Sequence, residues 1–294
     1  MEALMMSPAF TPHWIRANGL DLACLEAGSG PLVLCLHGFP DTAWSFQPLL
    51  TALADAGFRA VAPFMRGYAP TSLPADGDYR TTTLARDALA LIQACGEQRA
   101  FIVGHDWGAA TAYVAATLQP QRVRGIVTAA VPHLRRFLLR PTPMQLYRSR
   151  YMGFFQLRGV SEQRVAADNF AWLRALIRRW SPDWDFGEPE FAPLAGNFSD
   201  PARVTAALSY YRALPATLAS REGLTLLTRR LPVPARVIRG ADDGCIGAGM
   251  FERQAHCFDA GYELITMKGA GHFMHCEKPE LFAASVLEFL DRNA

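Results

Sequence analysis

The amino-acid sequence predicts an α/β protein with a mostly parallel, eight-stranded sheet, helices on both faces and an inserted helical cap. In the first 132 residues, apolar runs of strand length alternate with segments of helical periodicity. This alternation stops for roughly a hundred residues and resumes after residue 231. Half of the residues are apolar and 19% are charged, which is the composition of a globular chain with a large core.

The first expected elements are two antiparallel strands. Residues 13–16 and 21–26 flank an Asn18-Gly19 pair, and both residues of such a pair tolerate positive φ in a two-residue hairpin turn. Parallel strands and their connecting helices follow. The expected order is strand 32–36, helix 43–56, strand 59–63, helix 83–94, strand 101–104, helix 107–118, strand 125–131, then strands 235–239 and 262–267 and a closing helix 279–291.

The insert has helical patterns interrupted by prolines and contains no clear strand. We therefore expect a core domain formed by 1–132 and 232–294, and a cap or lid domain formed by 133–231. Between residues 134 and 180 ten arginines face two acidic residues, a local excess of +8. A solvated helix surface is the favoured explanation, and an anionic partner is the alternative.

Charge and hydropathy exclude several functions. The net charge is +2, which gives no case for nucleic acid, and no apolar run approaches the 18 or more residues of a membrane span. Residues 1–12 lack the basic and apolar regions of a secretory signal, so a cytoplasmic location is expected. The six cysteines show no CxxC spacing, which predicts buried, reduced thiols rather than disulfides or a zinc site. The oligomeric state does not follow from the sequence.

The strongest motif is Gly104-His105-Asp106-Trp107-Gly108, between an expected strand and an expected helix. Its spacing is that of the nucleophile elbow G-x-S-x-G, with aspartate in place of serine. Such a turn lifts its central side chain above the carboxyl edge of the sheet, beside a helix N-terminus that favours negative charge. Asp106 is therefore the expected nucleophile, and a simple helix N-cap is the alternative role.

An acid and a histidine follow in the order expected after an elbow. Asp243 comes just after strand 235–239, and His272 comes just after strand 262–267. Asp242 competes for the role of the acid, and His275 for that of the histidine. A His272/His275 pair or His256 could ligate a metal, but no carboxylate or cysteine stands at matching spacing, so we expect no metal and no cofactor.

The three positions together resemble the α/β-hydrolase-fold enzymes and, within that fold, the epoxide hydrolases. His37-Gly38-Phe39-Pro40 is similar to the family's oxyanion-loop motif, and Gly240-Ala-Asp-Asp243 is similar to its acid loop, whose G-x-x-D spacing selects Asp243 over Asp242. The resemblance covers essentially the whole chain. His37 and His105, each beside a motif glycine, are expected to be structural.

The nucleophile restricts the reaction. A carboxylate is ionised at pH 7, with a reference pKa of about 3.9, and attacks without a base. Attack on an ester would give an anhydride, whereas displacement at an sp³ carbon gives an alkyl ester that His272 and Asp243 can hydrolyse with water. The backbone N–H groups of Phe39 and Trp107 would then stabilise the oxyanion on Asp106. Epoxides and alkyl halides are the suitable substrates.

The resemblance extends into the cap. Tyr151-Met-Gly-Phe-Phe155-Gln156 resembles the epoxide hydrolase pattern Y-x-x-x-F-Q, and Ser209-Tyr-Tyr-Arg212 resembles its N-W-Y-R segment. It implies that Tyr151 and Tyr211 open the ring, with Tyr210 as a fallback donor. Substrate contacts are expected from Phe39, Trp107, Phe154 and Phe155, which would form a dry pocket for a small neutral epoxide and the attacking water.

Two alternatives stay open. Trp107 follows the nucleophile as it does in haloalkane dehalogenases, and Trp172, Trp180 and Trp184 lie in the cap, so halide displacement by the same aspartate is possible chemistry. Phe39 stands where many dehalogenases carry asparagine, which argues against a dehalogenase. The second alternative is a non-catalytic ligand receptor on the same fold. An apparently complete triad argues against a receptor.

Overall fold

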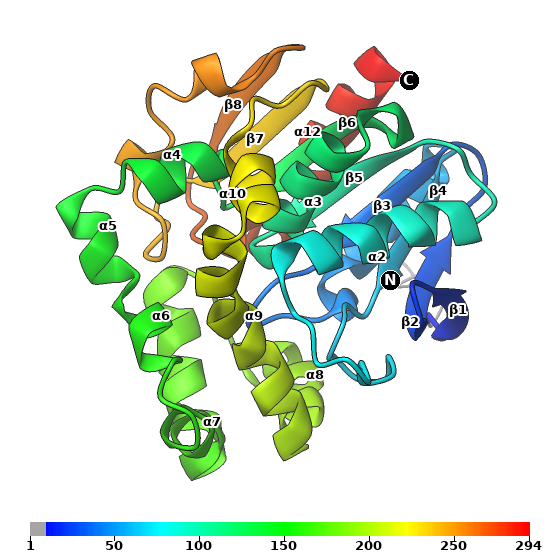
Figure 1. The fold of residues 1–294 in the computed structure, drawn as a ribbon. Coiled ribbons are helices and arrows are strands. Elements are labelled where there is room, and N and C mark those ends of the chain that lie inside the picture. Colours follow the sequence, from blue (N-terminus) through cyan, green and yellow to red (C-terminus); the bar gives the residue numbers. More distant parts are fainter. Residues whose placement is uncertain (1–9) are drawn as a thin grey trace, which may run out of the picture.

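The computed structural model describes residues 10–294, and within them one sheet of eight strands runs through the core, in the order β1-β2-β4-β3-β5-β6-β7-β8 (Figure 1). β2 pairs antiparallel with β1 and β4, and the remaining neighbours are parallel. The predicted eight-stranded α/β architecture is therefore confirmed. The strands are β1 (His13–Ala17), β2 (Leu20–Ala27), β3 (Leu32–Leu36), β4 (Arg59–Pro63), β5 (Ala100–His105), β6 (Val123–Ala129), β7 (Ala235–Gly240) and β8 (Tyr262–Met267).

Local chemistry explains where the elements begin and end. Asn18 and Gly19 have φ of 46° and 79°, as the predicted hairpin turn requires. The expected helix 43–56 divides into a 3₁₀ turn, η1, and helix α1, because Pro48 in the first α-helical turn has no N–H to continue the preceding hydrogen bonds. The strand expected at 125–131 lies two residues earlier, because Ala130 has a left-handed φ of 67°.

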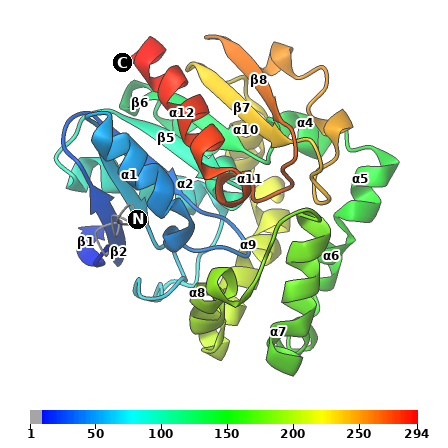
Figure 2. The same cartoon turned by 180° about the vertical axis from the view of Figure 1, so that it is seen from behind.

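Helices cover both faces of the sheet. α2 and α3 pack together on the face seen in Figure 1, and α1 and α12 pack together on the opposite face, seen in Figure 2. These layers bury the centre of the sheet: β3 is apolar and buried along its whole length, and β5 is buried along its whole length. The core helices and turns are η1 (Ala43–Phe46), α1 (Gln47–Asp55), α2 (Thr81–Ala94), α3 (Trp107–Leu118), η2 (Pro120–Arg122), η3 (Ala248–Met250), η4 (Ala255–Cys257), α11 (Met274–Glu277) and α12 (Pro279–Asn293).

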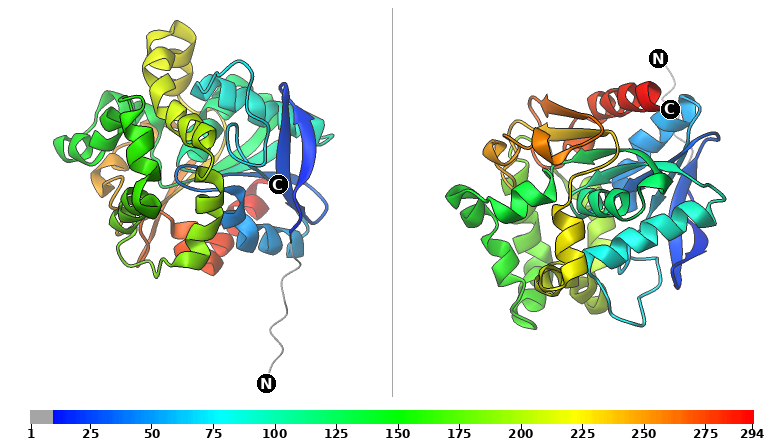
Figure 3. Two further views of the ribbon diagram at one scale, coloured as in Figure 1. Left: turned by 90° about the horizontal axis from the view of Figure 1, so that it is seen from below. Right: turned by 45° about the horizontal axis from the view of Figure 1, so that its top comes forward.

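The segment between β6 and β7 is helical, as predicted, and its helices gather at one end of the sheet (Figure 3). Three hydrogen bonds connect it to the loop after β4. The Tyr210 hydroxyl donates to the Arg66 carbonyl oxygen at 2.7 Å, the Ala69 N–H donates to the Asn197 side chain at 2.7 Å, and the Arg203 guanidinium donates to the Thr71 carbonyl oxygen at 2.7 Å. These helices are α4 (Leu134–Leu139), α5 (Pro143–Arg148), α6 (Arg150–Phe154), α7 (Val160–Trp180), α8 (Glu188–Phe198), α9 (Pro201–Ala219) and α10 (Arg221–Thr228).

Other sequence expectations concern cysteines, membranes and the N-terminus. All six cysteines are free, and five are buried, as predicted. In residues 10–294, no helix is long and apolar enough to cross a membrane. The expectation that residues 1–12 form no secretory signal falls largely on residues 1–9, which lie outside the described part of the chain.

Candidate active site

Asp106 occupies a sharp turn between β5 and α3. Its backbone has φ 50° and ψ −114°, a strained conformation for a residue with a side chain, and its carboxylate makes no N-cap hydrogen bond. The two motif glycines make the turn possible. A Cβ on Gly108 would lie 1.9 Å from the Leu36 carbonyl oxygen, and one on Gly104 would lie 2.4 Å from the Gly108 carbonyl oxygen. The elbow therefore holds Asp106 as a projecting carboxylate rather than as a helix cap.

The loop after β3 reaches the same carboxylate. The Phe39 N–H donates to Asp106 Oδ1 at 2.8 Å. A Cβ on Gly38 would lie 2.4 Å from Asp106 Cβ, so only glycine permits this approach. Within residues 10–294 no hydrogen bond joins the Trp107 N–H to the carboxylate, so of the two expected oxyanion donors only Phe39 contacts Asp106 in this state.

His272, in the loop after β8, lies between two carboxylates, Asp106 after β5 and Asp243 after β7. Its Nδ1 is 3.0 Å from Asp243 Oδ2, and its Nε2 faces Asp106 Oδ2 at 3.7 Å. The Cys245 and Ile246 N–H groups donate to Asp243 Oδ1 at 2.6 and 2.8 Å, which fixes the acid beneath the imidazole. The structure thus brings together the three residues expected as the triad.

The competing residues lie elsewhere. Asp242 is exposed, whereas Asp243 is buried against His272. His275 points away from Asp106 and bonds to Asp41 instead. The residues chosen from the chain order and from the family's G-x-x-D spacing, Asp243 and His272, are therefore the ones that lie beside Asp106.

Electrostatics of the triad favour a charged imidazole. Burial of His272 lowers its pKa, but the negative charges of Asp243 and Asp106 outweigh this, and the pKa of His272 is raised to about 10. The imidazole is therefore protonated at neutral pH. Loss of either negative charge would lower that pKa.

Tyr151 on α6 and Tyr211 on α9 both line the cavity that contains Asp106. Their ring centroids lie 5.7 Å apart, nearly perpendicular. The Tyr151 hydroxyl contacts Cys245 Sγ at 3.7 Å, and the Tyr211 hydroxyl is buried with no hydrogen-bond partner in the described chain. Burial, with Asp106 nearby, raises the pKa of both phenols well above the ordinary value, so both stay protonated. The Tyr210 hydroxyl donates to the Arg66 carbonyl oxygen, and its role as fallback donor stays a prediction.

The cavity itself is small, about 60 Å³, and is walled mainly by apolar side chains. Sequence reasoning identified Asp106, Trp107, Tyr151 and Tyr211 but missed most of this wall. The signal was available in part, because residues 134, 137 and 138 repeat at helical spacing on α4. The further apolar lining residues are Ala110, Val131, Leu134, Phe137, Leu138, Met152, Leu214, Leu227 and Ile246.

The phenylalanines expected to contact substrate lie behind this wall. Phe155 is fully buried and packs between the rings of Phe39 and Tyr211, at centroid distances of 5.4 and 5.0 Å. Phe154 stacks on Trp172 at 5.7 Å, on the outer side of α6. Phe39 therefore reaches the site through its backbone, and direct substrate contact by the three phenylalanine rings stays a prediction.

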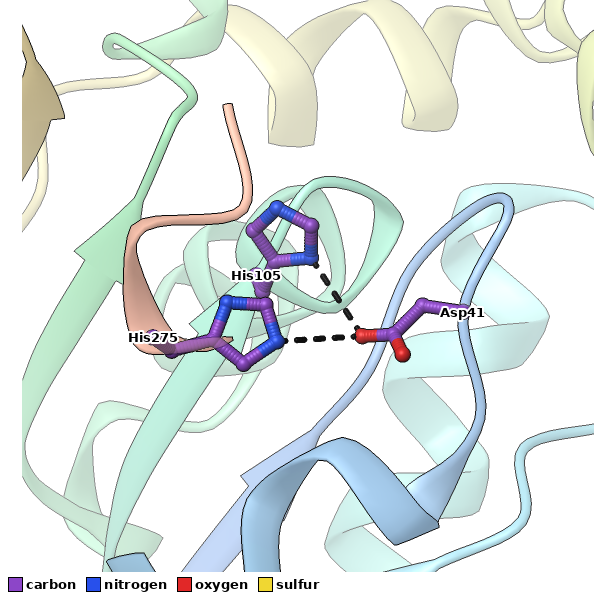
Figure 4. A group of neighbouring side chains, drawn as sticks. All are labelled: Asp41, His105 and His275. Atoms are coloured by element: carbon purple, nitrogen blue, oxygen red, sulfur yellow. Dashed lines mark hydrogen bonds and ion pairs between the residues drawn. The ribbon is translucent and has the colours of Figure 1, made fainter. Parts of the chain in front are cut away.

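Behind the triad lies a second buried cluster of Asp41, His105 and His275 (Figure 4). His275 Nε2 and His105 Nδ1 face Asp41 Oδ2 at 3.2 and 3.6 Å. His105 Nε2 donates to the carbonyl oxygen of His272 at 3.0 Å, so the cluster supports the backbone of the triad histidine. Its donor set could hold a metal ion, and it differs from the His272/His275 pair weighed from sequence. The structural role expected for His105 agrees with this contact.

Trp180, at the end of α7, connects the helical insert to the loops that carry Asp243 and His272. Its carbonyl oxygen accepts from the N–H groups of Gly244 and His272 at 3.0 and 3.1 Å, and its ring packs on the His272 imidazole at 4.9 Å. Sequence reasoning considered this tryptophan only as a halide donor. A backbone contact of this kind leaves no signal in residue identity.

Comparison with known proteins agrees with this geometry. Residues 31–279 match the model of the α/β hydrolase fold family. The chain is 30% identical over 285 residues to AB hydrolase superfamily protein YfhM of Bacillus subtilis (strain 168), covering 95% of this chain and 97% of that protein. It is 31% identical over 316 residues to epoxide hydrolase A of Mycobacterium tuberculosis (strain ATCC 25618 / H37Rv), with the same coverage.

A solved structure is also similar to this chain over nearly its whole length. The crystal structure of epoxide hydrolase A from Mycobacterium thermoresistibile superposes with a TM-score of 0.81 at 28% identity, covering 96% of this chain and 98% of that one. The elbow, the triad order and these matches place the chain in the α/β hydrolase fold family. The protein is a hydrolase.

Proposed function

We propose that this hydrolase is an epoxide hydrolase that converts epoxides to vicinal diols through an ester on Asp106. The observation that carries the proposal is the position of two protonated, buried tyrosines across the cavity from the Asp106 carboxylate. An ionised carboxylate supplies the nucleophile, and paired phenols supply the acidic O–H donors that a leaving alkoxide needs. Similarity to proteins named epoxide hydrolases supports the same conclusion.

In the first step an Asp106 oxygen bonds to a ring carbon while the bond from that carbon to the ring oxygen breaks. The ring oxygen takes a proton from Tyr151 or Tyr211 and becomes the first hydroxyl of the product. Ester formation removes the charge of Asp106, so the pKa of His272 falls from its raised value. The imidazolium then gives its proton to the tyrosinate, and both groups become neutral.

In the second step neutral His272 takes a proton from water, and the hydroxide attacks Cγ of the Asp106 ester. The Phe39 N–H already bonds to the carboxylate and would stabilise the oxyanion, with the Trp107 N–H as the second donor expected from sequence. The bond from Cγ to the diol oxygen breaks, and that oxygen takes the proton from His272. The remaining water proton returns to His272, which restores the charged resting state.

Single turnover in ¹⁸O-labelled water tests the ester directly. Enzyme in excess over a styrene-type epoxide should give a first diol that lacks label, because its second oxygen comes from Asp106. Labelled solvent oxygen should appear on Asp106 in the digested protein. First-turnover diol that carries solvent label would show direct attack by water and would refute the ester.

Haloalkane dehalogenation is the second candidate, because the Trp107 side chain lines the cavity beside the same nucleophile. A parallel panel of epoxides and haloalkanes, read by mass spectrometry, separates the two functions. We expect diols from epoxides and no halide release. No turnover with either substrate class would favour the receptor alternative. The cytoplasmic location and the core and cap boundaries at 133–231 remain predictions.

A further inference from the structure

The buried cluster behind the proposed triad contains Asp41, His105 and His275, which come from three segments of the core (Figure 4). Asp41 lies in the loop after β3, His105 ends β5, and His275 lies on α11. All three offer ligand atoms within 4.8 Å of one another. The Thr42 N–H donates to Asp41 Oδ1 at 2.7 Å, so Asp41 Oδ2 is the oxygen that faces the two histidines.

His105 and Asp41 place two acceptors face to face. Nε2 of His105 contacts the carbonyl oxygen of His272 at 3.0 Å, and a carbonyl oxygen only accepts, so this nitrogen carries the hydrogen. Burial lowers the pKa of His105 to about 4, so its Nδ1 keeps a lone pair at neutral pH. That Nδ1 faces Asp41 Oδ2 at 3.6 Å and has no hydrogen-bond partner among residues 10–294. A cation between the two acceptors would stabilise this buried pair.

The spacing of the donors fits a tetrahedral transition-metal ion. Ligand atoms about 2.1 Å from a tetrahedral zinc ion lie about 3.4 Å apart. Asp41 Oδ2 lies 3.6 Å from His105 Nδ1 and 3.2 Å from His275 Nε2, on either side of that value. The Ser45 hydroxyl, 2.9 Å from Asp41 Oδ2, offers a fourth oxygen. Two imidazoles and one carboxylate suit zinc better than magnesium or calcium, which prefer oxygen ligands.

A cleft of about 790 Å³ opens beside the cluster, and both Asp41 and Ser45 line it. Residues of η1, α1, α8 and α12 form much of its wall. Three further carboxylates, all exposed, line the same cleft: Asp55, Glu190 and Glu280. The described lining contains no lysine, arginine or histidine, so the negative field of the cleft attracts cations toward Asp41.

We propose that Asp41, His105 and His275 bind one divalent transition-metal ion of the zinc class, which enters through this cleft. The ion bonds to Asp41 Oδ2, His105 Nδ1 and His275 Nε2, with water or the Ser45 hydroxyl as the fourth ligand. Because His105 also holds the backbone of His272, the ion stabilises the loop that carries the triad histidine. This role is structural.

The assignment departs from the absence of metal expected from sequence. The sequence offered only histidines near one another as candidate ligands, whereas Asp41 and His105 join His275 from distant segments. The metal site does not depend on the reaction of Asp106, so the failure of either proposal leaves the other standing.

Calorimetric titration of chelator-treated protein with zinc chloride tests the site. We expect one zinc ion per chain and no measurable binding of magnesium chloride. His275→Gln should weaken zinc binding by about 100-fold or more, since even the loss of an outer hydrogen bond to a ligand costs roughly 10- to 100-fold. His256→Gln is the control and should bind zinc as the wild type does, because His256 is exposed beside Cys257 and lies outside the cluster. No zinc binding by the wild type, unchanged affinity in His275→Gln, or loss of binding in His256→Gln would overturn the proposal.

Two measurements keep the inference testable if His275→Gln does not fold. Cobalt(II) in the wild-type protein should give the intense visible absorption of a tetrahedral site rather than the weak absorption of a six-coordinate ion. Zinc at a hundredfold excess over its Kd should raise the Tm by about 5 °C, because the ion binds only the folded chain. Asp41→Asn should remove both effects. A weak, six-coordinate cobalt spectrum, or an equal Tm shift in Asp41→Asn, would overturn the site.

Discussion

The sheet and the cap contribute to one cavity by different means. Asp106, Asp243 and His272 stand at strand ends and are fixed by backbone: a strained φ, clashing glycine positions and N–H donors to each carboxylate. Tyr151 and Tyr211 stand on helices and are fixed mainly by ring packing. The Tyr151 hydroxyl has one weak sulfur contact, and the Tyr211 hydroxyl has no hydrogen-bond partner among residues 10–294. Backbone geometry thus holds the three residues of the proposed triad, whereas side-chain packing holds the two proposed proton donors.

This comparison predicts that changes in the sheet residues remove the reaction, whereas changes in the cap residues only slow it. Asp106→Ala should reduce turnover by on the order of 10⁵-fold or more, as expected when a covalent nucleophile is lost. Steady-state diol formation measures the effect. Asp242→Ala is the matched control, since it removes an exposed carboxylate next to Asp243. Residual turnover of Asp106→Ala within a hundredfold of wild type would show that the sheet does not supply the nucleophile.

His272→Gln should separate the two half-reactions. Carboxylate attack needs no base, so an ester should form rapidly, while its hydrolysis should slow by about 10⁴-fold. Intact-protein mass spectrometry should show a substrate adduct on the variant. His256→Gln is the control, because His256 is an exposed histidine outside the triad and the Asp41 cluster. Absence of both an adduct and a burst of ring opening would assign His272 a role in the first step.

The cap tyrosines should have intermediate effects. Tyr151→Phe or Tyr211→Phe removes one of two donors to the alkoxide and should slow ring opening by about 10² to 10³-fold, and the double variant should nearly stop it. Pre-steady-state ester formation is the relevant measurement. Both residues also pack in the cap, so the thermal midpoint of each variant is needed beside the rate. A folded double variant that opens epoxides at the wild-type rate, with halide release lost in Trp107→Phe, would favour dehalogenation.

Electrostatic coupling within the proposed triad should give a smaller effect, a change in the pKa of His272 that NMR can detect. The pKa of His272, about 10 in the resting protein, depends on both Asp106 and Asp243. Asp106→Asn should lower it, because one negative charge is removed and burial opposes the charged form. Since the pKa exceeds the usual value of about 6.5, the charged triad stabilises the fold at neutral pH and loses this contribution as the pH rises through 10. NMR titration of the His272 imidazole measures its pKa. The pH dependence of the thermal midpoint measures the contribution of the charged imidazole to stability. An unchanged pKa in the variant would show that the 3.7 Å contact carries no coupling.

The residues at the strand ends were easier to predict from sequence than the residues on the inserted helices. The strands, the elbow and His272 follow from apolar runs, spacing and chain order, because parallel strands bring their carboxyl ends to one edge. The choice of Asp243 over Asp242 came from the resemblance. Tyr151 and Tyr211 followed only from a resemblance, since no helical periodicity says which face of α6 or α9 meets the cavity. The Trp180 carbonyl contacts and the Asp41 cluster join segments distant in sequence through backbone or buried polar groups. Residue identities alone do not encode such pairings.

The smallest predicted effect tests whether packing alone positions the cap. Tyr210 is adjacent to Tyr211 on α9, but its hydroxyl donates to the Arg66 carbonyl oxygen in the core, away from the cavity. Tyr210→Phe keeps the ring contacts and leaves that buried carbonyl without its donor, so the free energy of unfolding should fall by about 1 to 2 kcal/mol. Ring opening by the folded variant should stay within about threefold of wild type, because no donor to the alkoxide is lost. Urea unfolding and ester-formation rates measure the two quantities. A hundredfold slower ring opening with unchanged stability would mean that Tyr210 is itself a donor, and α9 would then need to rotate from the orientation that places Tyr211 against Trp107.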